Sequence, residues 1–298
     1  MSQKPRRSFL KKGLGMTALP ILGFAPRPVL PSREGKNLKL SLNAYSFNAC
    51  LRDNVLSLDG LFDFCAENAI PAIDLTAYYI KGYPQVPEDR LLYDIKKKAH
   101  YRGLDISGTG VRNDFTVGDK AQRKKDIQHV KNWIVAASKL GAPVLRVFAG
   151  KAKAEGGEWL NLAEGVIEAM QECAAFGAEY GVLVAMQNHN DFIKSADQVN
   201  FIMENVNEEW FGLVLDVGSY SLKDPYEEIS QNIQYAVNWQ IKENINHFGE
   251  QKPVDLKRLM TIIKRSDYNG YLPIETLGPG DPFEKVKHFL KAVRKSMR

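Results

Sequence analysis

The sequence is poor in cysteine, and its cysteines form no recognisable motif. Cys50, Cys65 and Cys173 contain no Cys-x-x-Cys pair, and three thiols cannot all pair within one chain. These observations argue against a disulfide framework, so the sequence predicts buried free thiols.

Membrane-spanning hydrophobic runs are also missing. The apolar stretch from Gly13 to Phe24 falls well short of the ~20 residues that a spanning helix needs, and no later segment approaches that length. We therefore expect no stable membrane insertion once this N-terminal stretch is removed.

Positive charge is scarce outside the first residues. The 298 residues carry a net charge of +5 at pH 7, but residues 1–30 contain six lysines and arginines and no acidic residue, which leaves the remainder at −1. A nearly neutral chain lacks the basic surface that attracts phosphates. The composition therefore predicts no nucleic-acid partner.

The basic N-terminal segment is typical of an export signal. The sequence PRRSFLKK contains the pair Arg6 and Arg7, and an uncharged stretch and a proline-rich stretch follow it. A charged region before a short apolar region is the arrangement of secretory signals. Residues 1–30 resemble the twin-arginine signal, so we expect export to the periplasm after folding in the cytoplasm.

The motif Gly-x-Gly-x-x-Gly does not follow the first predicted strand, which argues against an open, doubly wound sheet. Eight apolar or β-branched runs alternate with amphipathic helical patterns instead. The runs begin near Leu38, Ala72, Leu104, Val144, Leu183, Phe211, Val237 and Tyr271. This alternation, with no linker after residue 36, predicts a single-domain (β/α)8 TIM barrel over residues 37–298.

Polar residues end several of the predicted strands. Alternate residues of a barrel strand face the axis, and active sites lie at the carboxyl ends of the strands. The alternation predicts an axial quartet on four successive strands: Gln187, Asp216, Gln240 and Glu275. Four convergent oxygens suit a hard divalent cation such as Mg²⁺ or Mn²⁺. The alternative for each residue alone is hydrogen bonding at a strand end.

The strand ends QNHNDF, GLVLDVGSY, NWQIKE and YLPIETLG resemble those of the xylose isomerase-like superfamily of TIM barrels. That superfamily contains sugar and sugar-phosphate isomerases and epimerases, hydroxypyruvate isomerases and a type of AP endonuclease. The resemblance implies a divalent metal held by Glu, Asp, His and Glu on these strands. Asp216 and Glu275 match, whereas Gln187 replaces Glu, Gln240 replaces His, and Ser219 stands where His often follows.

These departures change the mechanism that the resemblance implies. Sugar epimerases of this type use two glutamates as acid and base on opposite sides of one carbon. Gln187 cannot exchange a proton near neutral pH, so Glu275 is left as the single catalytic carboxylate. The substitution also lowers the negative charge of the ligand set, which predicts weaker metal binding or none.

Other residues near these strand ends are candidates for chemistry. His189 could act as a general acid or base, or could bond a loop carbonyl instead. Lys242 could stabilise an enolate, or could form a salt bridge with a neighbouring carboxylate. Arg146 could bind a substrate carboxylate, phosphate or hydroxyl group, or could pair with Asp74. The predicted substrate contacts are Asn43, Tyr45, Arg146 and Asn188, of which Asn43 and Tyr45 lie on one side of the first predicted strand, LKLSLNAYSF. The stretch GKAKAEGGEWL, residues 150–160, is expected to be a loop that shapes the pocket.

The sequence therefore predicts an exported enzyme that abstracts a proton next to the carbonyl of a sugar or keto-sugar. Isomerisation or epimerisation is the leading expectation, with assistance from a metal left open. A lyase or hydratase with one catalytic carboxylate, and a catalytically silent sugar-binding barrel, are the alternatives. The five histidines cannot easily supply the multi-metal site of an AP endonuclease. The expected partner is a small carbohydrate, and self-association into homo-oligomers stays open.

Overall fold

The computed structural model describes residues 37–189 and 191–298, which belong to one compact unit. The predicted signal segment, residues 1–30, lies outside the described residues. Within the described part of the chain, no helix is both long enough and apolar enough to cross a membrane.

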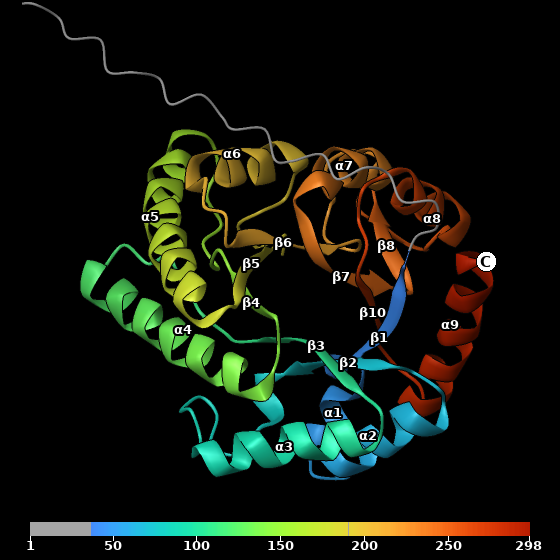
Figure 1. Cartoon of the computed structure of the whole chain (residues 1–298). Coiled ribbons are helices and arrows are strands. Elements are labelled where there is room, and N and C mark those ends of the chain that lie inside the picture. Colours follow the sequence, from blue (N-terminus) through green and yellow to red (C-terminus); the bar gives the residue numbers. More distant parts are fainter. Residues whose placement is uncertain (1–36, 190) are drawn as a thin grey trace, which may run out of the picture. The chain divides into compact units, whose positions relative to one another are not determined.

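Eight parallel strands close into a barrel, as the sequence predicts (Figure 1). In chain order they are β1 (Lys39–Asn43), β2 (Ala72–Thr76), β3 (Asp105–Gly110), β4 (Val144–Phe148), β5 (Leu183–Gln187), β6 (Phe211–Asp216), β7 (Ala236–Lys242) and β10 (Tyr271–Glu275). Strands β1 and β10 pair in register from Lys39 opposite Tyr271, which closes the ring. The fold is therefore a TIM barrel.

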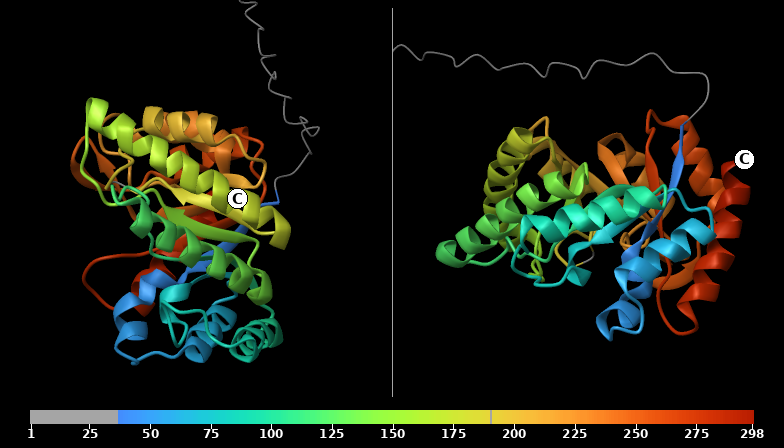
Figure 2. Two further views of the ribbon diagram at one scale, coloured as in Figure 1. Left: turned by 90° about the vertical axis from the view of Figure 1, so that its left-hand side faces the viewer. Right: turned by 60° about the horizontal axis from the view of Figure 1, so that its bottom comes forward.

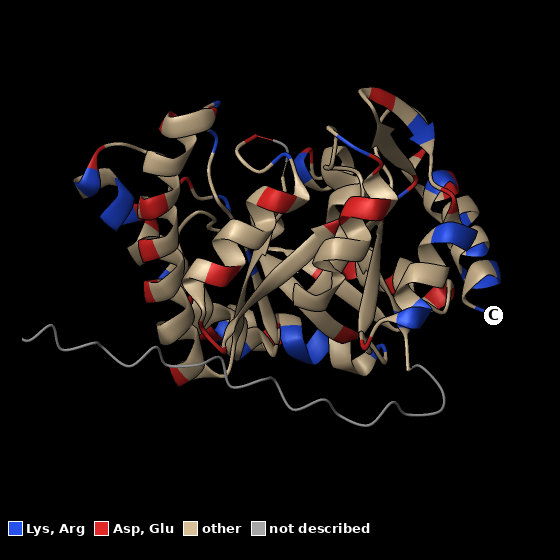
Figure 3. Cartoon of the chain, turned by 90° about the horizontal axis from the view of Figure 1, so that it is seen from above, with Lys and Arg blue, Asp and Glu red and all other residues tan. Residues whose placement is uncertain are grey.

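Helices surround the strands on the outside, as two further views show (Figure 2). They are α1 (Asn48–Arg52), α2 (Leu58–Glu67), α3 (Asp89–Tyr101), α4 (Lys120–Leu140), α5 (Gly156–Tyr180), α6 (Ala196–Val206), α7 (Pro225–Asn232), α8 (Leu256–Arg265) and α9 (Pro282–Met297). Gly141 and Gly181 end α4 and α5 in the left-handed conformation, which glycine adopts without steric cost. Charged residues belong mainly to these helices and the loops (Figure 3).

The structure adds elements that the strand–helix pattern does not contain. Strands β8 (Asn244–His247) and β9 (Glu250–Pro253) form an antiparallel hairpin directly after β7. Helix α5 begins at Gly156, inside a stretch predicted to be a loop. Strand β1 ends at Asn43, and Ala44–Phe47 is a 3-10 helix, so Tyr45 does not continue the strand as predicted.

The interior of the barrel changes from apolar to polar along its axis. Val144, Ala185 and Val214 form a small buried cluster, against which Leu183 and Val237 pack. Polar residues at the carboxyl ends of the same strands lie above this cluster. The apolar layer therefore forms the floor of the polar site.

Two irregularities alter the strict alternation of side chains. The register between β6 and β7 shifts at Leu213/Val214, and the register between β2 and β3 shifts at Ile73/Asp74. At the first shift, Val237 packs into the barrel. Its neighbour Asn238 also reaches the interior, where it donates to Asp74 at 3.2 Å. Strict alternation predicts opposite sides for these two neighbours.

Candidate active site at the carboxyl end of the barrel

The predicted quartet converges in space. Gln187 Nε2 donates to Asp216 Oδ2 and to Gln240 Oε1, both at 2.7 Å. Asp216 lies opposite Gln240 in the β6/β7 pairing, and Glu275 lies opposite Lys242 in the β10/β7 pairing. The closed sheet thus brings residues of four strands to one buried site.

Lys242 holds the centre of this cluster. Its Nζ lies 2.6 Å from Asp216 Oδ2 and 3.6 Å from Glu275 Oε2. Burial favours the neutral amine, but the two carboxylates outweigh burial and raise the pKa of Lys242 above its ordinary value. The side chain is therefore an ammonium, and the predicted salt bridge to a neighbouring carboxylate is present with two partners.

The two carboxylates have opposite protonation tendencies. Burial opposes ionisation of Asp216, but Lys242, the Gly218 amide and Gln187 together lower its pKa below the ordinary value. Burial raises the pKa of Glu275 to about 7, because Lys242 opposes burial only in part and the charge of Asp216 adds to it. Asp216 is therefore a fixed anion, whereas Glu275 can gain or lose a proton near neutral pH.

Asn188, which is a predicted substrate contact, binds the backbone of Asp216 in the structure. Its Nδ2 donates to the backbone oxygen of Asp216 at 2.9 Å, and its Oδ1 accepts from the backbone nitrogen of Asp216 at 2.7 Å. The side chain is fully buried. Asn188 therefore fixes the end of β6 and so positions the Asp216 carboxylate.

Arg146 presents a buried cation one strand away from the quartet. The residue is 6% exposed, and it donates to the backbone oxygen of Val111 and to the Tyr78 hydroxyl, both at 2.9 Å. Its guanidinium also lies 4.3 Å from the centre of the Phe148 ring. These contacts replace the direct pairing with Asp74 that the sequence left open.

Gly110, the last residue of β3, provides the space for this guanidinium. A Cβ atom at Gly110 would lie 2.7 Å from both Nε and Nη2 of Arg146, closer than atoms approach without a shift. The absence of a side chain at this position therefore decides where the Arg146 charge lies.

Asp74 is a second buried carboxylate inside the barrel. Burial raises its pKa to about 6, although Arg146 and the hydrogen bond from Asn238 oppose this. It lies among interior polar groups and is 4% exposed. Together with Glu275, it gives the barrel two carboxyl groups that titrate well above their ordinary range.

His189 lies beyond the end of β5, at the edge of the site. Its Nδ1 is 3.0 Å from Asp191 Oδ2, and its ring packs edge-on against Phe148 with the ring centres 5.1 Å apart. The side chain is 39% exposed. His189 and Arg146 therefore both contact the Phe148 ring.

The loop after β2 contributes aromatic residues that the sequence analysis did not name as site residues. The guanidinium of Arg112 lies 4.4 Å from the centre of the Tyr78 ring, whose hydroxyl accepts from Arg146. Tyr79 donates to Asn48 at 2.9 Å and interacts electrostatically with Glu275. These residues form an aromatic wall of the site. The three tyrosines in the sequence TAYYIKGY could have indicated it.

The two predicted contacts on β1 lie close to that wall. Asn43 Oδ1 accepts from the backbone nitrogen of Tyr45 at 2.8 Å, which caps the short 3-10 helix. Asn43 is buried, whereas Tyr45 is half-buried. Asn43 therefore supports the turn that presents Tyr45.

The converged quartet does not fit a divalent metal as its side chains lie. Gln187 directs its amide nitrogen, a donor, at Asp216 and Gln240, and Lys242 lies between the two carboxylates. Within residues 37–189 and 191–298, no group of three or more His, Cys, Asp or Glu side chains is arranged to hold a metal ion. As its side chains lie, the quartet is a hydrogen-bonded polar cluster, and the metal site stays a prediction.

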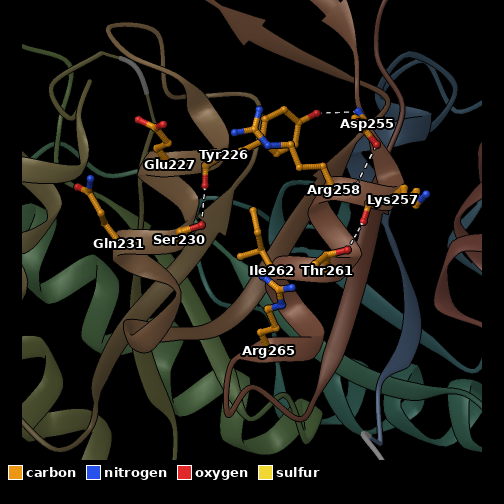
Figure 4. A pocket seen from close by; sticks show the side chains of 10 residues that line it. All are labelled: Tyr226, Glu227, Ser230, Gln231, Asp255, Lys257, Arg258, Thr261, Ile262 and Arg265. Atoms are coloured by element: carbon orange, nitrogen blue, oxygen red, sulfur yellow. Dashed lines mark hydrogen bonds between the residues drawn. The ribbon is translucent and has the colours of Figure 1, made fainter.

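A separate groove of about 700 Å³ lies outside the barrel, between α7 and α8 (Figure 4). The Asp255 amide donates to the Tyr226 hydroxyl at 2.6 Å, and Arg258 pairs with Asp224 at 2.7 Å. The groove contains none of the predicted site residues among its described lining residues, so we place no chemistry there.

Residues 62–295 match the family model described as a xylose isomerase-like TIM barrel. The chain belongs to this family. No curated protein sequence matches the chain significantly.

Solved structures of the xylose isomerase-like fold resemble the chain at low sequence identity. D-psicose 3-epimerase from Clostridium cellulolyticum H10 is 12% identical, with a TM-score of 0.71 over 87% of this chain and 99% of the epimerase. The 3-keto-D-glucoside 4-epimerase from E. coli is 10% identical, with a TM-score of 0.69 over 88% of this chain and 100% of the other. A probable 3-DHS dehydratase from Bacillus anthracis is 18% identical, with a TM-score of 0.62 over 86% of this chain and 97% of the other.

Proposed function

We propose that the protein is an enzyme that abstracts a proton next to the carbonyl of a sugar or keto-sugar, with Glu275 as the base. The observation that carries this proposal is the pairing of a buried carboxylate of pKa about 7 with a fixed ammonium at the carboxyl end of a TIM barrel. A general base works best when its pKa lies near the working pH. An ammonium beside it can stabilise the negative charge that the reaction creates.

The chemistry follows from these two groups. Glu275 takes the proton from the carbon next to the carbonyl, and the electron pair of the broken C–H bond forms an enolate whose charge rests on the carbonyl oxygen. Lys242, held 3.6 Å from Glu275 and 2.6 Å from Asp216, supplies positive charge to that oxygen. Asp216 keeps Lys242 charged and in place, so it acts as a positioning residue.

Two outcomes of the enolate are consistent with the family. Gln187 cannot return a proton from a second side, which favours loss of a substituent on the next carbon, or the reverse addition of water. The dehydratase among the structural neighbours is consistent with this elimination. Epimerisation is the second candidate, since two neighbours are sugar epimerases, and it needs a separate proton donor such as His189 with its partner Asp191.

Arg146 and the aromatic wall supply the substrate contacts in this proposal. Arg146 binds a hydroxyl or carboxylate oxygen of the substrate, and Tyr78 and Tyr45 offer hydroxyl groups and apolar ring faces, which suit a sugar. Export through the signal-like residues 1–30 would place this activity in the periplasm. Phosphorylated sugars are then poorer candidates than free or oxidised ones.

The test is an activity screen with free sugars, 3-keto-glycosides and sugar phosphates, each with and without Mn²⁺. Substrate loss and product structure are followed by NMR in D₂O, where enolisation exchanges the abstracted proton for deuterium. We expect exchange with a keto-sugar for the native protein and none for Glu275→Gln. Sugar binding without exchange for any substrate would support the silent binding barrel instead.

A further inference from the structure

Lys242 occupies the position between the two carboxylates that match the metal ligands of the family. Its Nζ contacts Asp216 Oδ2 at 2.6 Å and Glu275 Oε2 at 3.6 Å, and its side chain is 17% exposed. We propose that this ammonium takes the place of the divalent metal, so that the protein carries its own cation at the end of β7. The electrostatic part of this inference stands alone, and its use in catalysis rests on the proposed function.

The orientation of Gln187 supports this assignment. Its amide nitrogen donates to both Asp216 Oδ2 and Gln240 Oε1 at 2.7 Å. A metal ligand would have to present the amide oxygen. Turning the amide would bring that oxygen against the two oxygens that now accept its hydrogens, and two hydrogen bonds would be lost. The glutamine is therefore set as a donor.

The hydrogen bonds of Asp216 leave little capacity for a metal. Oδ2 accepts from Lys242 and from Gln187, and Oδ1 accepts from the Gly218 amide at 2.9 Å. The backbone of Asp216 is fixed by Asn188 on both its nitrogen and its oxygen. Protein donors thus occupy three of the about four acceptor sites of the carboxylate, and an entering cation would have to compete with them.

The charge of the cluster supports the same conclusion. Asp216 and Glu275 bring two negative charges when both are ionised, and Lys242 neutralises one of them. A divalent ion added beside the ammonium would leave a positive excess in a buried site, which is costly. The neutral amides of Gln187 and Gln240 do not offset that charge, whereas the Glu that the family carries in place of Gln187 would cancel it.

Gly218 supplies the space that the long side chain requires. A Cβ atom at Gly218 would lie 2.7 Å from Cδ of Lys242. The lysine stem therefore passes directly over the turn whose amide bonds to Asp216. The lysine side chain packs closely against this turn. In this way Lys242, which lies beyond Gln240 on the same strand, reaches back to the carboxylates.

The experiment compares Mn²⁺ binding in four forms of the full chain after dialysis against EDTA. They are the native protein, Lys242→Ala, the double variant Gln187→Glu/Gln240→His, and the triple variant that combines all three changes. Mn²⁺ is titrated alone, without substrate, and is followed by electron paramagnetic resonance and by metal content after gel filtration. Thermal unfolding of each form confirms that it is folded.

We expect the native protein and the double variant to bind Mn²⁺ weakly, because both keep the ammonium. The triple variant should bind one Mn²⁺ at least about tenfold more tightly than the double variant, since ligand removals at metal sites have effects of this size. The proposal is overturned if the double variant binds as tightly as the folded triple variant, or if the native protein retains one Mn²⁺ per chain after dialysis.

These readouts are separate from the proposed reaction. Mn²⁺ binding is measured without a substrate, so a wrong sugar or a wrong reaction leaves the result unchanged. Conversely, a native protein that holds Mn²⁺ would refute the role of Lys242 while leaving Glu275 as a base in the activity screen. A second comparison, Lys242→Arg, keeps the charge and should also bind Mn²⁺ weakly.

Discussion

Glu275 Oε2 lies 3.6 Å from Lys242 Nζ, whereas Asp216 Oδ2 lies 2.6 Å from the same nitrogen. This difference separates the roles of two carboxylates that are both buried. The closer one has a lowered pKa and remains the counter-ion of the ammonium. The more distant one has its pKa raised to about 7 and is free to exchange a proton. One lysine thus distinguishes a fixed anion from a carboxyl group that can exchange a proton.

Glu275→Gln should lower kcat on the best substrate by about 10²- to 10⁴-fold, because general-base catalysis contributes an effect of this size. KM should change much less, since the amide keeps the shape of the side chain. Glu204→Gln on α6, at an exposed position, is the matched control and should leave kcat unchanged. Undiminished turnover in Glu275→Gln would exclude Glu275 as the base.

The pH profile of kcat/KM should rise through about pH 7 and then level off, because the base must be ionised in the free enzyme. The Lys242 charge opposes the effect of burial on the pKa of Glu275, so removing it should raise that pKa further. In Lys242→Met, the residual kcat/KM should therefore rise with pH through a midpoint that is higher than in the native enzyme. Lys242→Arg keeps the charge and should keep the profile. A profile that is flat between pH 6 and about 8 contradicts the assignment.

Gly110→Ala should displace the Arg146 guanidinium, because its Cβ would lie 2.7 Å from Nε. If Arg146 binds the substrate, KM should rise about tenfold, the equivalent of ~1.4 kcal/mol, with a smaller change in kcat. Gly118→Ala is a suitable control, since no atom lies within 4 Å of its added Cβ. Steady-state kinetics of the two variants distinguish this displacement from a general loss of stability.

Asp74→Asn should flatten the pH dependence of stability. The pKa of Asp74 is about 6 in the folded protein against an ordinary value of 3.8, so the folded state binds its proton more tightly than the unfolded state. The stability that comes from this group is complete at pH values below 3.8 and is lost as the pH rises through about 6.

The substitution should remove a decline in the free energy of unfolding on the order of 2 to 3 kcal/mol between pH 4 and pH 8. Urea unfolding at several pH values measures this decline. Asp267→Asn changes an exposed aspartate and should leave the slope as it is. The expectation fails if Asp74→Asn follows the native protein across the whole range.

The barrel and its polar centre are strongly encoded in the sequence. Several strands are short, largely apolar runs that end in a polar residue, and the period of two was enough to assign Gln187, Asp216, Gln240 and Glu275 to one side. The barrel then brings them together, because parallel strands in a closed sheet end on the same rim. The strand ends were therefore predictable even where their chemistry was not.

The orientation of long side chains and of amide side chains could not be predicted from the sequence. Nothing in the order of residues tells which end of the Gln187 amide faces Asp216, or that Lys242 bends back between two carboxylates. The register shift at Leu213/Val214 also breaks the alternation on which strand reading depends. Tyr45 was misplaced for a related reason, since Asn43 caps a 3-10 helix where the apolar pattern suggested more strand.

The hairpin of β8 and β9 begins after Glu243, the residue that follows Lys242. The Val254 amide closes the base of the hairpin by donating to the Glu243 carbonyl at 3.0 Å. The hairpin is therefore an insertion at the rim of the barrel, whereas Lys242 and Asp216 belong to the strands beneath it. A change in the length of the hairpin tip would reshape the rim while the ammonium and its counter-ion stay anchored in the sheet.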